Sequence, residues 1–193
     1  EIIVNKMFNK LLFVIIILFF FNLSKPSLSK EIFINEINKI KANIVFLRHS
    51  FAPGFGDPVN FKINDCSTQR NLSMEGVLQA REIGNFLIGN NIEFTEILSS
   101  EWCRCVDTIK EMNIGDWKTF SGLNSFFQNF TDKKNNLLLL NNKINSLSED
   151  ERILLITHQV VISEVTNISP PSGGIVIYNS KSKMSKLIKN FLE

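Results

Sequence analysis

Hydrophobic residues along the chain follow two spacings, one typical of buried strands and one typical of amphipathic helices. Short runs dominated by apolar residues predict strands at 43–48, 96–99, 118–120, 152–157, 175–178 and 186–189. Apolar residues that recur every three or four positions predict helices at 31–41, 73–90, 102–112, 131–147 and 160–165. The Gly and Pro residues between 50 and 72 instead predict a long loop. Because strands alternate with helices, we expect one layered α/β domain over residues 30–193.

The beginning of the chain departs from this pattern. A short basic start at 7–10 precedes eleven consecutive apolar residues at 11–21, and small residues follow at 27–29. This is the arrangement of a secretory signal peptide, and the apolar run is shorter than the roughly 20 residues that cross a bilayer. We therefore predict that 1–29 is a signal peptide and that the domain is secreted or periplasmic. The alternative is an uncleaved N-terminal anchor that tethers the domain to the inner membrane through 11–23.

The charge of the domain argues against nucleic acid as a partner. The chain has 21 Lys and Arg residues against 19 Asp and Glu residues, a formal net charge of +2. Segment 1–29 holds three of the basic residues and one of the acidic ones, so the remaining domain is neutral. A neutral domain without basic runs lacks the electrostatic footprint of a nucleic-acid-binding protein.

The chain has three cysteines, Cys66, Cys103 and Cys105. Export would place them in an oxidising compartment, where one disulfide is expected. Cys103 and Cys105 lie two residues apart on a predicted helix and point to different sides, so Cys66 should pair with one of them. The spacing lacks a nearby histidine and a C-x-x-C pair, and we predict no metal site.

Two histidines and two arginines indicate a binding site. His49 and His158 each follow a predicted buried strand, in "VFLRH" and "LLITH", and ligands of open α/β sheets bind outside the carboxyl ends of strands. Arg48 precedes the first histidine, and Arg104 opens the helix that follows a third strand, in "SSEWCRCVDT". Capping a strand end is the simpler interpretation of either histidine alone. Together with two arginines, whose planar forks match phosphate oxygens, the histidines predict a pocket for a phosphoryl group.

Four segments carry a resemblance to a known family. Arg48-His49, "NLSMEGVLQAREIGNFL", "SSEWCRCVDT" and "LLITHQ" occur in the order found in the histidine phosphatase superfamily, over about residues 42–179. Within it, "DCSTQRNL" and "WCRC" resemble an exported bacterial branch. The resemblance implies a phosphoglycerate mutase-like fold, a three-layer α/β sandwich with a mostly parallel mixed sheet flanked by helices. Ser50 stands where the family most often has glycine.

The resemblance also implies an activity, that of a phosphoric monoester hydrolase without metal or other cofactor. His49 would be the nucleophile that forms a phosphohistidine, and Arg48, Arg104 and His158 would bind the phosphoryl oxygens. Arg70 and Ser50 are further candidates for contact with phosphate or substrate. The substrate would be a small-molecule phosphate ester or a phosphorylated component of the cell envelope.

One part of the family pattern is missing. The family's general acid is a Glu after the second arginine or an Asp after the second histidine, but the corresponding places here read "GLNSFF" and "HQ". Asp57, Asp65 and Glu101 are the remaining candidates, although loop capping or a solvated charge is the simpler interpretation of each. The missing acid keeps open a catalytically impaired phosphate-binding or regulatory module. A membrane-anchored interaction protein with incidental histidines is the third hypothesis.

Overall fold

The computed structural model describes residues 28–148, 150–189 and 191–192. The predicted signal peptide or anchor lies outside the described residues, apart from positions 28 and 29, which open the first helix. Within those ranges, no helix combines the length and the apolar character that crossing a membrane requires.

A six-stranded mixed sheet forms the centre of the domain, with the strand order β3-β2-β4-β1-β5-β6. The strands are β1 (Ile44–Arg48), β2 (Glu96–Ser99), β3 (Lys118–Thr119), β4 (Ile153–Thr157), β5 (Ile175–Tyr178) and β6 (Ser185–Ile188). Strands β3, β2, β4 and β1 pair in parallel, whereas β5 runs antiparallel to β1 and β6 antiparallel to β5. The predicted mostly parallel sheet is therefore confirmed.

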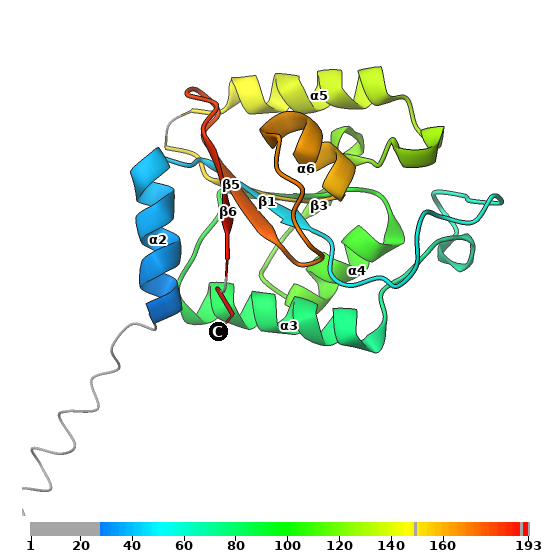
Figure 1. Cartoon of the computed structure of the whole chain (residues 1–193), viewed down its shortest axis with the longest axis horizontal. Coiled ribbons are helices and arrows are strands. Elements are labelled where there is room, and N and C mark those ends of the chain that lie inside the picture. The colour runs from blue at the N-terminus through cyan, green and yellow to red at the C-terminus, as the bar shows by residue number, and fades with distance from the viewer. Residues whose placement is uncertain (1–27, 149, 190, 193) are drawn as a thin grey trace, which may run out of the picture.

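Helices cover both faces of this sheet and complete a three-layer sandwich (Figure 1). They are α2 (Leu28–Ile40), α3 (Met74–Gly89), α4 (Cys103–Met112), α5 (Lys133–Ser146) and α6 (Gln159–Thr166). Alternate strand residues point to opposite faces. Val45 and Leu47 of β1 pack with α2, α3 and α4, whereas Ile44 and Phe46 pack with α5 and α6. Both faces of β1 are thus buried, which explains why its sequence is a continuous apolar run.

Helices α3 and α4 approach closely at a glycine. A Cβ atom added at Gly84 would lie 2.0 Å from the carbonyl oxygen of Met112 at the end of α4. Helix α3 begins after its N-cap Ser73, whose hydroxyl accepts a hydrogen bond from the N–H of Gly76. This close packing fixes the position of α4, which carries Arg104.

A disulfide attaches the long loop after β1 to the start of α4. Cys66, in a short 3-10 turn (Cys66–Thr68), is bonded to Cys103 with an S–S distance of 2.00 Å, and Cys105 is free and buried. The structure therefore has one of the two pairings predicted from the sequence. The side chain of Gln69 adds a second attachment, because its Oε1 accepts a hydrogen bond from the N–H of Cys103 at 3.0 Å.

Candidate active site

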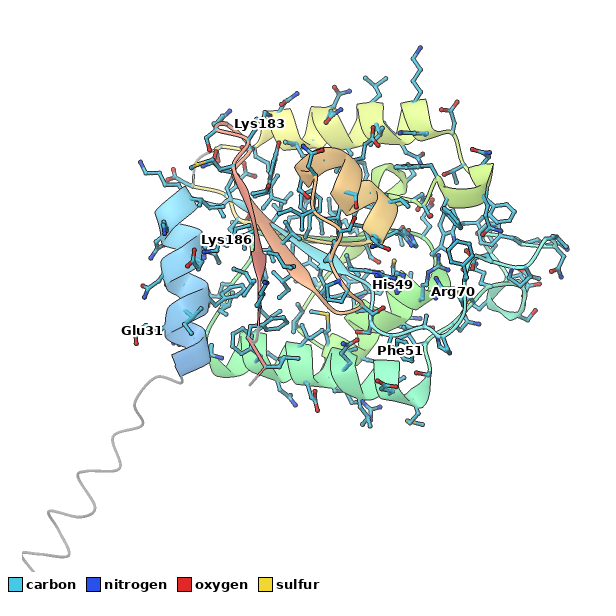
Figure 2. The ribbon with its side chains drawn as sticks, viewed as in Figure 1. Glu31, His49, Phe51, Arg70, Lys183 and Lys186 are labelled. Atoms are coloured by element: carbon cyan, nitrogen blue, oxygen red, sulfur yellow. A yellow bond between two sulfur atoms is a disulfide. The ribbon has the colours of Figure 1, made fainter. Side chains whose placement is uncertain are left out.

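The two histidines meet at the carboxyl ends of the central strands. His49 directly follows β1, and His158 directly follows β4, the parallel neighbour of β1. Their ring centroids are 5.4 Å apart, and both residues are buried. Figure 2 shows His49 and Arg70 at one end of the domain and Glu31 of α2 at the other. The structure therefore brings the two histidines singled out in the sequence into one site.

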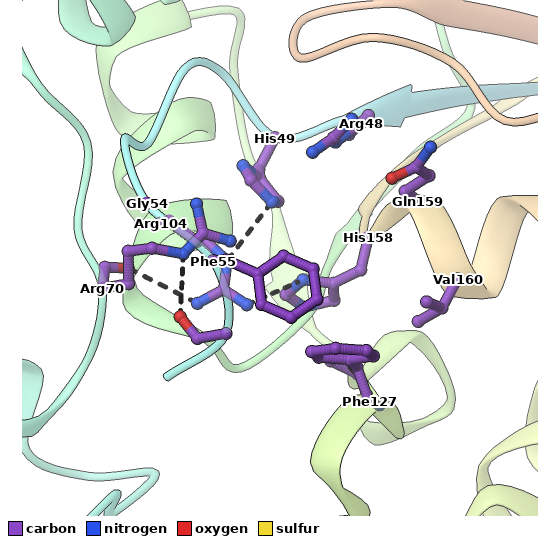
Figure 3. Close-up of a pocket in the computed structure, with 12 residues that line it drawn as sticks. Arg48, His49, Gly54, Phe55, Arg70, Arg104, Phe127, His158, Gln159 and Val160 are labelled. Carbon is purple, nitrogen blue, oxygen red and sulfur yellow. Dashed lines mark hydrogen bonds between the residues drawn. The ribbon is translucent and has the colours of Figure 1, made fainter. Parts of the chain in front are cut away.

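Arg104, in the first turn of α4, lies against both rings (Figure 3). Its Nε–H donates to Nε2 of His49 at 3.2 Å, and its Nη2–H donates to Nδ1 of His158 at 3.3 Å. The side chain of Arg104 is buried. One guanidinium edge thus faces the two imidazoles, and the structure brings Arg104 together with the two histidines of the predicted phosphoryl-binding cluster.

Hydrogen bonds fix the tautomer of each histidine. The Nδ1 atom of His49 lies 2.8 Å from the carbonyl oxygen of Ser50, which can only accept, so Nδ1 carries the proton and Nε2 carries the lone pair that accepts from Arg104. For His158, Nε2 lies 3.0 Å from the hydroxyl of Ser100, whose own proton goes to Oδ1 of Asn124. Nε2 of His158 is therefore the donor, and Nδ1 accepts from Arg104.

Both imidazoles are held in the neutral form. Burial is the main reason that the pKa of His49 lies well below its usual value, followed by the charge of Arg104, which outweighs the opposing hydrogen bond to Ser50. Burial and then the charge of Arg104 also lower the pKa of His158 well below the usual value. A neutral imidazole with an unprotonated Nε2 is the form in which a histidine acts as a nucleophile, and Nε2 of His49 is exposed for attack once Arg104 no longer donates to it.

The network around His158 refines its expected role. With its proton on Nε2, His158 presents an acceptor toward Arg104 and no N–H toward the pocket. In this form it orients Arg104 rather than binding a phosphoryl oxygen. A phosphate dianion nearby would favour the charged imidazole, raise the pKa of His158 and place a proton on Nδ1.

A pocket of about 130 Å³ opens beside these residues. Its lining is Arg48, His49, Gly54, Phe55, Gly56, Arg70, Arg104, Ser125, Phe127, His158, Gln159 and Val160 (Figure 3). Burial, and then the charge of Arg104, lower the pKa values of Arg48 and Arg70, as expected when cations are crowded together. A bound anion would relieve this repulsion, so the pocket is suited to a phosphate group.

Arg70 and Ser50, the two further candidates, are placed differently. Arg70 lines the pocket and also anchors its own loop, donating from Nε to the carbonyl of Gly56 at 3.0 Å and from Nη1 to the carbonyl of Ala52. Ser50 is fully buried and does not line the pocket, and its hydroxyl has no hydrogen-bond partner in the described part of the chain. Its contribution to the site is the carbonyl that orients His49.

None of the three carboxylates proposed as general acids lines the pocket. Asp65 caps the 3-10 turn by accepting from the N–H and hydroxyl of Ser67, and Glu101 accepts from Nδ2 of Asn124 at 2.5 Å. Asp57 is buried and pairs with Arg104. No Asp or Glu in the described ranges contributes to the pocket wall. Among the described residues, the pocket wall therefore offers no carboxyl group as a general acid.

Asp57 instead forms a buried ion pair that the sequence did not indicate. Its Oδ1 accepts from Nη1 of Arg104 at 2.8 Å and from the N–H of Arg70 at 3.0 Å. Its Oδ2 accepts from Nη2 of Arg104 at 3.1 Å and from the indole of Trp102 at 3.1 Å. Burial alone would raise the pKa of Asp57, but Arg104 and the other donors outweigh it and lower the pKa. Asp57 is therefore ionised at neutral pH and unable to donate a proton.

Sequence reasoning also missed several residues of the pocket wall. Gln159 and Val160 open α6 directly after His158, a position that the strand-end rule would have included. Ser125 and Phe127 come from the loop between β3 and α5, where the sequence alone leaves open whether Phe127 lines an apolar wall of the pocket or anchors the loop. Among the described residues, no three His, Cys, Asp or Glu side chains gather as metal ligands would.

The comparison with known proteins supports the fold. No family model matches the sequence, and no curated protein matches it. Solved structures do match, among them one described as the protein histidine phosphatase SixA complexed with tungstate, with 19% identity, a TM-score of 0.50, and coverage of 75% of this chain and 93% of that chain. Another is phosphoserine phosphatase from Entamoeba histolytica in complex with 3-phosphoglyceric acid, with 15% identity, a TM-score of 0.52, and coverage of 78% and 98%.

These structural neighbours belong to the histidine phosphatase superfamily. The predicted phosphoglycerate mutase-like fold is therefore confirmed. At these identities the likeness concerns the fold alone, and the resemblance to an exported bacterial branch stays a prediction.

Proposed function

We propose that this protein is a phosphatase that hydrolyses a phosphate monoester through a covalent phosphohistidine on His49. The observation that carries this proposal is the state of His49, whose Nδ1–H is bound to the Ser50 carbonyl while the Nε2 lone pair faces Arg104. The phosphatases named among the structural neighbours share this fold and give the proposal further support.

The reaction has two displacement steps. In the first, Nε2 of His49 attacks phosphorus, the P–O bond to the leaving group breaks, and the departing oxygen keeps the electron pair, either as an anion or with a proton taken from water. In the second, water attacks phosphorus, the P–N bond breaks, and its electron pair returns to Nε2, which releases inorganic phosphate. Arg48 would bind the phosphoryl oxygens in both transition states, where a single well-placed donor contributes about 10²–10³ in rate. Arg104 would do the same by exchanging its hydrogen bonds to His49 and His158 for phosphoryl oxygens, which also exposes Nε2 of His49 for attack.

The source of the leaving-group proton limits which substrates react. No carboxyl group of the described chain lines the pocket, and Asp57 is held ionised by Arg104. The proton would therefore come from water, or the leaving group would depart as an anion. We expect kcat to rise steeply as the pKa of the leaving group falls.

The same observation favours a second candidate function, a phosphate-binding or regulatory module without turnover. Such a module would bind phosphate in the cluster of Arg48, Arg70 and Arg104 and hydrolyse nothing. It predicts that inorganic phosphate raises the Tm, because phosphate at one hundred times its Kd adds about 2.7 kcal/mol to the free energy of unfolding. It also predicts that p-nitrophenyl phosphate is not hydrolysed.

A trapping experiment separates the two functions. The purified protein is mixed with a ³²P-labelled phosphomonoester and quenched in alkali, which preserves phosphohistidine. The wild type should carry label that acid removes, and His49→Asn should carry none. Equal labelling of His49→Asn would refute the assignment of the nucleophile. Phosphate protection without label or turnover would favour the binding module.

We also propose that the domain works outside the cytoplasm, on a small phosphate ester or a phosphorylated envelope component. The signal-peptide pattern of 1–29 and the Cys66–Cys103 disulfide support this location. N-terminal sequencing of the protein recovered from cell fractions tests it. A mature chain that begins near residue 30 in the soluble fraction is expected, whereas an intact 1–29 in the membrane fraction would indicate the tether through 11–23.

A further inference from the structure

Two phenylalanines stand at the mouth of the pocket. The side chains of Phe55, from the loop after β1, and Phe127, from the loop before α5, meet edge to face with ring centroids 5.1 Å apart. Phe55 is 90% exposed and Phe127 38% exposed. A single exposed phenylalanine is ordinary on a protein surface. Two that contact each other at the entrance of a cationic pocket, from loops far apart in the sequence, form a defined apolar rim.

The rim is held in place by a pairing between the two loops. The N–H of Asp57 donates to Oε1 of Gln128 at 2.7 Å, and Nε2 of Gln128 donates to the carbonyl of Asp57 at 3.1 Å. A Cβ atom at Gly56 would lie 2.6 Å from the Gln128 side chain, so glycine is needed for this approach. Gln128 and Asn129 both adopt a positive φ, of 64° and 60°. Left-handed backbone is costly for residues with a Cβ atom and often marks functional sites.

The size of the pocket places the rest of the substrate at this rim. A volume of about 130 Å³ is below the roughly 300–1,000 Å³ of pockets that enclose a whole ligand. Arginine and histidine side chains line its interior, so the phosphoryl group belongs there. The ester group must then lie at the mouth, where the exposed Phe55 and Phe127 present apolar surface.

The chemistry of the leaving group points to the same class of substrate. The described pocket wall has no carboxyl group to donate a proton. An aliphatic alcohol would therefore leave its phosphate ester as a poorly stabilised alkoxide. A phenol, with a pKa of about 10 as in tyrosine, leaves as a far more stable anion. A planar phenyl group can also pack edge to face or offset against the two rings of the rim.

We infer that the site takes phosphate monoesters of phenols, with the aromatic leaving group packed against Phe55 and Phe127. This inference rests on the proposed function for its chemistry, but the binding preference itself does not require turnover. In either case the ligand is an aryl phosphate, which can be a free small molecule or the side chain of a phosphotyrosine.

A binding experiment tests the rim without catalysis. Phenylphosphonate and methylphosphonate are compared by titration calorimetry with the full-length protein at a pH where both are dianions, because neither has a leaving oxygen. Phenylphosphonate should bind about two- to tenfold tighter, the range expected for one aromatic contact. Phe55→Ala and Phe127→Ala should each reduce this ratio toward one, because the loss falls on phenylphosphonate and not on methylphosphonate. Leu138→Ala, an exposed residue on α5, is the control and should keep the wild-type ratio.

A kinetic experiment then links the rim to the reaction. Phenyl phosphate and acetyl phosphate both have good leaving groups, but only the first has a ring. Phe55→Ala should lower kcat/KM for phenyl phosphate about two- to tenfold more than it lowers kcat/KM for acetyl phosphate. A phosphotyrosine peptide compared with phenyl phosphate distinguishes the two sources of the aryl group.

Each outcome bears on one proposal or the other. Equal affinity of the wild type for the two phosphonates, with acetyl phosphate still hydrolysed, would overturn the aryl subsite and leave the phosphatase standing. A parallel loss with both substrates in Phe55→Ala would also overturn it, since the rim would then only support the loop. A preference for phenylphosphonate with no phosphohistidine and no turnover would sustain the subsite and refute the phosphatase.

Discussion

The ion pair between Asp57 and Arg104 gives a sharp test of how the site is held together. Asp57→Asn keeps the shape of the side chain but replaces one acceptor oxygen with a donor NH₂. In the wild type, each carboxylate oxygen accepts two hydrogen bonds, one from Arg104 and one from a second donor, Arg70 N–H or the Trp102 indole. Whichever way the amide turns, its NH₂ faces two donors, so two of the four hydrogen bonds are lost.

The structure sets the size of the effect on stability. The Asp57 and Arg104 side chains are 5% and 4% exposed, so solvent screens their interaction little. Removing one partner of a buried ion pair costs about 3–5 kcal/mol, and the two retained hydrogen bonds place Asp57→Asn near the lower end, at about 3 kcal/mol. Urea unfolding measures this loss directly. Asp65→Asn, which changes a carboxylate on the same loop that is bonded to Ser67 and to no cation, should lose much less stability.

The effect on activity separates a positioning role from a proton-donor role. Asp57 holds the outer fork of Arg104, while the Nε and Nη2 of Arg104 face His49 and His158. If Asp57 only positions Arg104, Asp57→Asn should lower kcat about 10–100-fold, part of what a lost transition-state donor costs. The factor should be the same for p-nitrophenyl phosphate and for an alkyl phosphate, and inorganic phosphate should bind at least as tightly, because a negative charge has been removed.

Two results would refute this reasoning. A loss confined to the alkyl phosphate would identify Asp57 as the general acid, against its lowered pKa. Wild-type stability together with wild-type kcat would mean that the buried pair neither stabilises the loop nor positions Arg104.

Three further predictions follow from the packing and from the buried groups. The pKa values of His49 and His158 in the folded protein lie well below the value of about 6.5 in the unfolded chain. On acidification the unfolded chain therefore binds up to two more protons than the folded protein. The free energy of unfolding should then fall between pH 6.5 and 4.5, by as much as about 2.7 kcal/mol per pH unit. The lowered pKa of Asp57 reduces the free energy of unfolding only below about pH 4, so the histidines account for the change above it. His158→Gln should roughly halve the slope of unfolding free energy against pH, measured by urea unfolding. A wild-type unfolding free energy that does not change with pH would contradict the neutral histidines. The Cys66–Cys103 disulfide joins residues that are 37 positions apart in the sequence. By the chain-entropy relation, the double variant Cys66→Ala/Cys103→Ala should lose about 4 kcal/mol of unfolding free energy. A loss under about 1 kcal/mol would show that the loop is held in place without the disulfide. Gly84→Ala should force α3 and α4 apart and lower the free energy of unfolding by about 1–3 kcal/mol. Gly89→Ala, with no atom within 4 Å of its added Cβ, is the control and should be neutral or slightly stabilising. Equal melting curves for the two variants would contradict the close approach of the two helices.

Much of the fold follows from local pattern in the sequence. The apolar runs that became β1 and β4 and the helical periods that became α3 and α4 reflect burial on one or two faces, which is written in residue spacing. The helix start at Ser73 follows from a side chain that satisfies a nearby N–H. The convergence of His49 and His158 was also predictable, because parallel strands deliver the residues at their carboxyl ends to the same edge of a sheet.

What the sequence by itself determined is therefore the layered α/β fold and the cluster of His49, His158, Arg48 and Arg104 at one edge of the sheet. Only the tertiary structure decided that Cys66 pairs with Cys103, that Asp57 binds Arg104 and so does not act as an acid, and that Phe55 and Phe127 form the rim. Each of these depends on the path of the loop after β1. That path is fixed by contacts between residues far apart in the chain, and neither periodicity nor turn propensity, which act over a few residues, encodes such contacts.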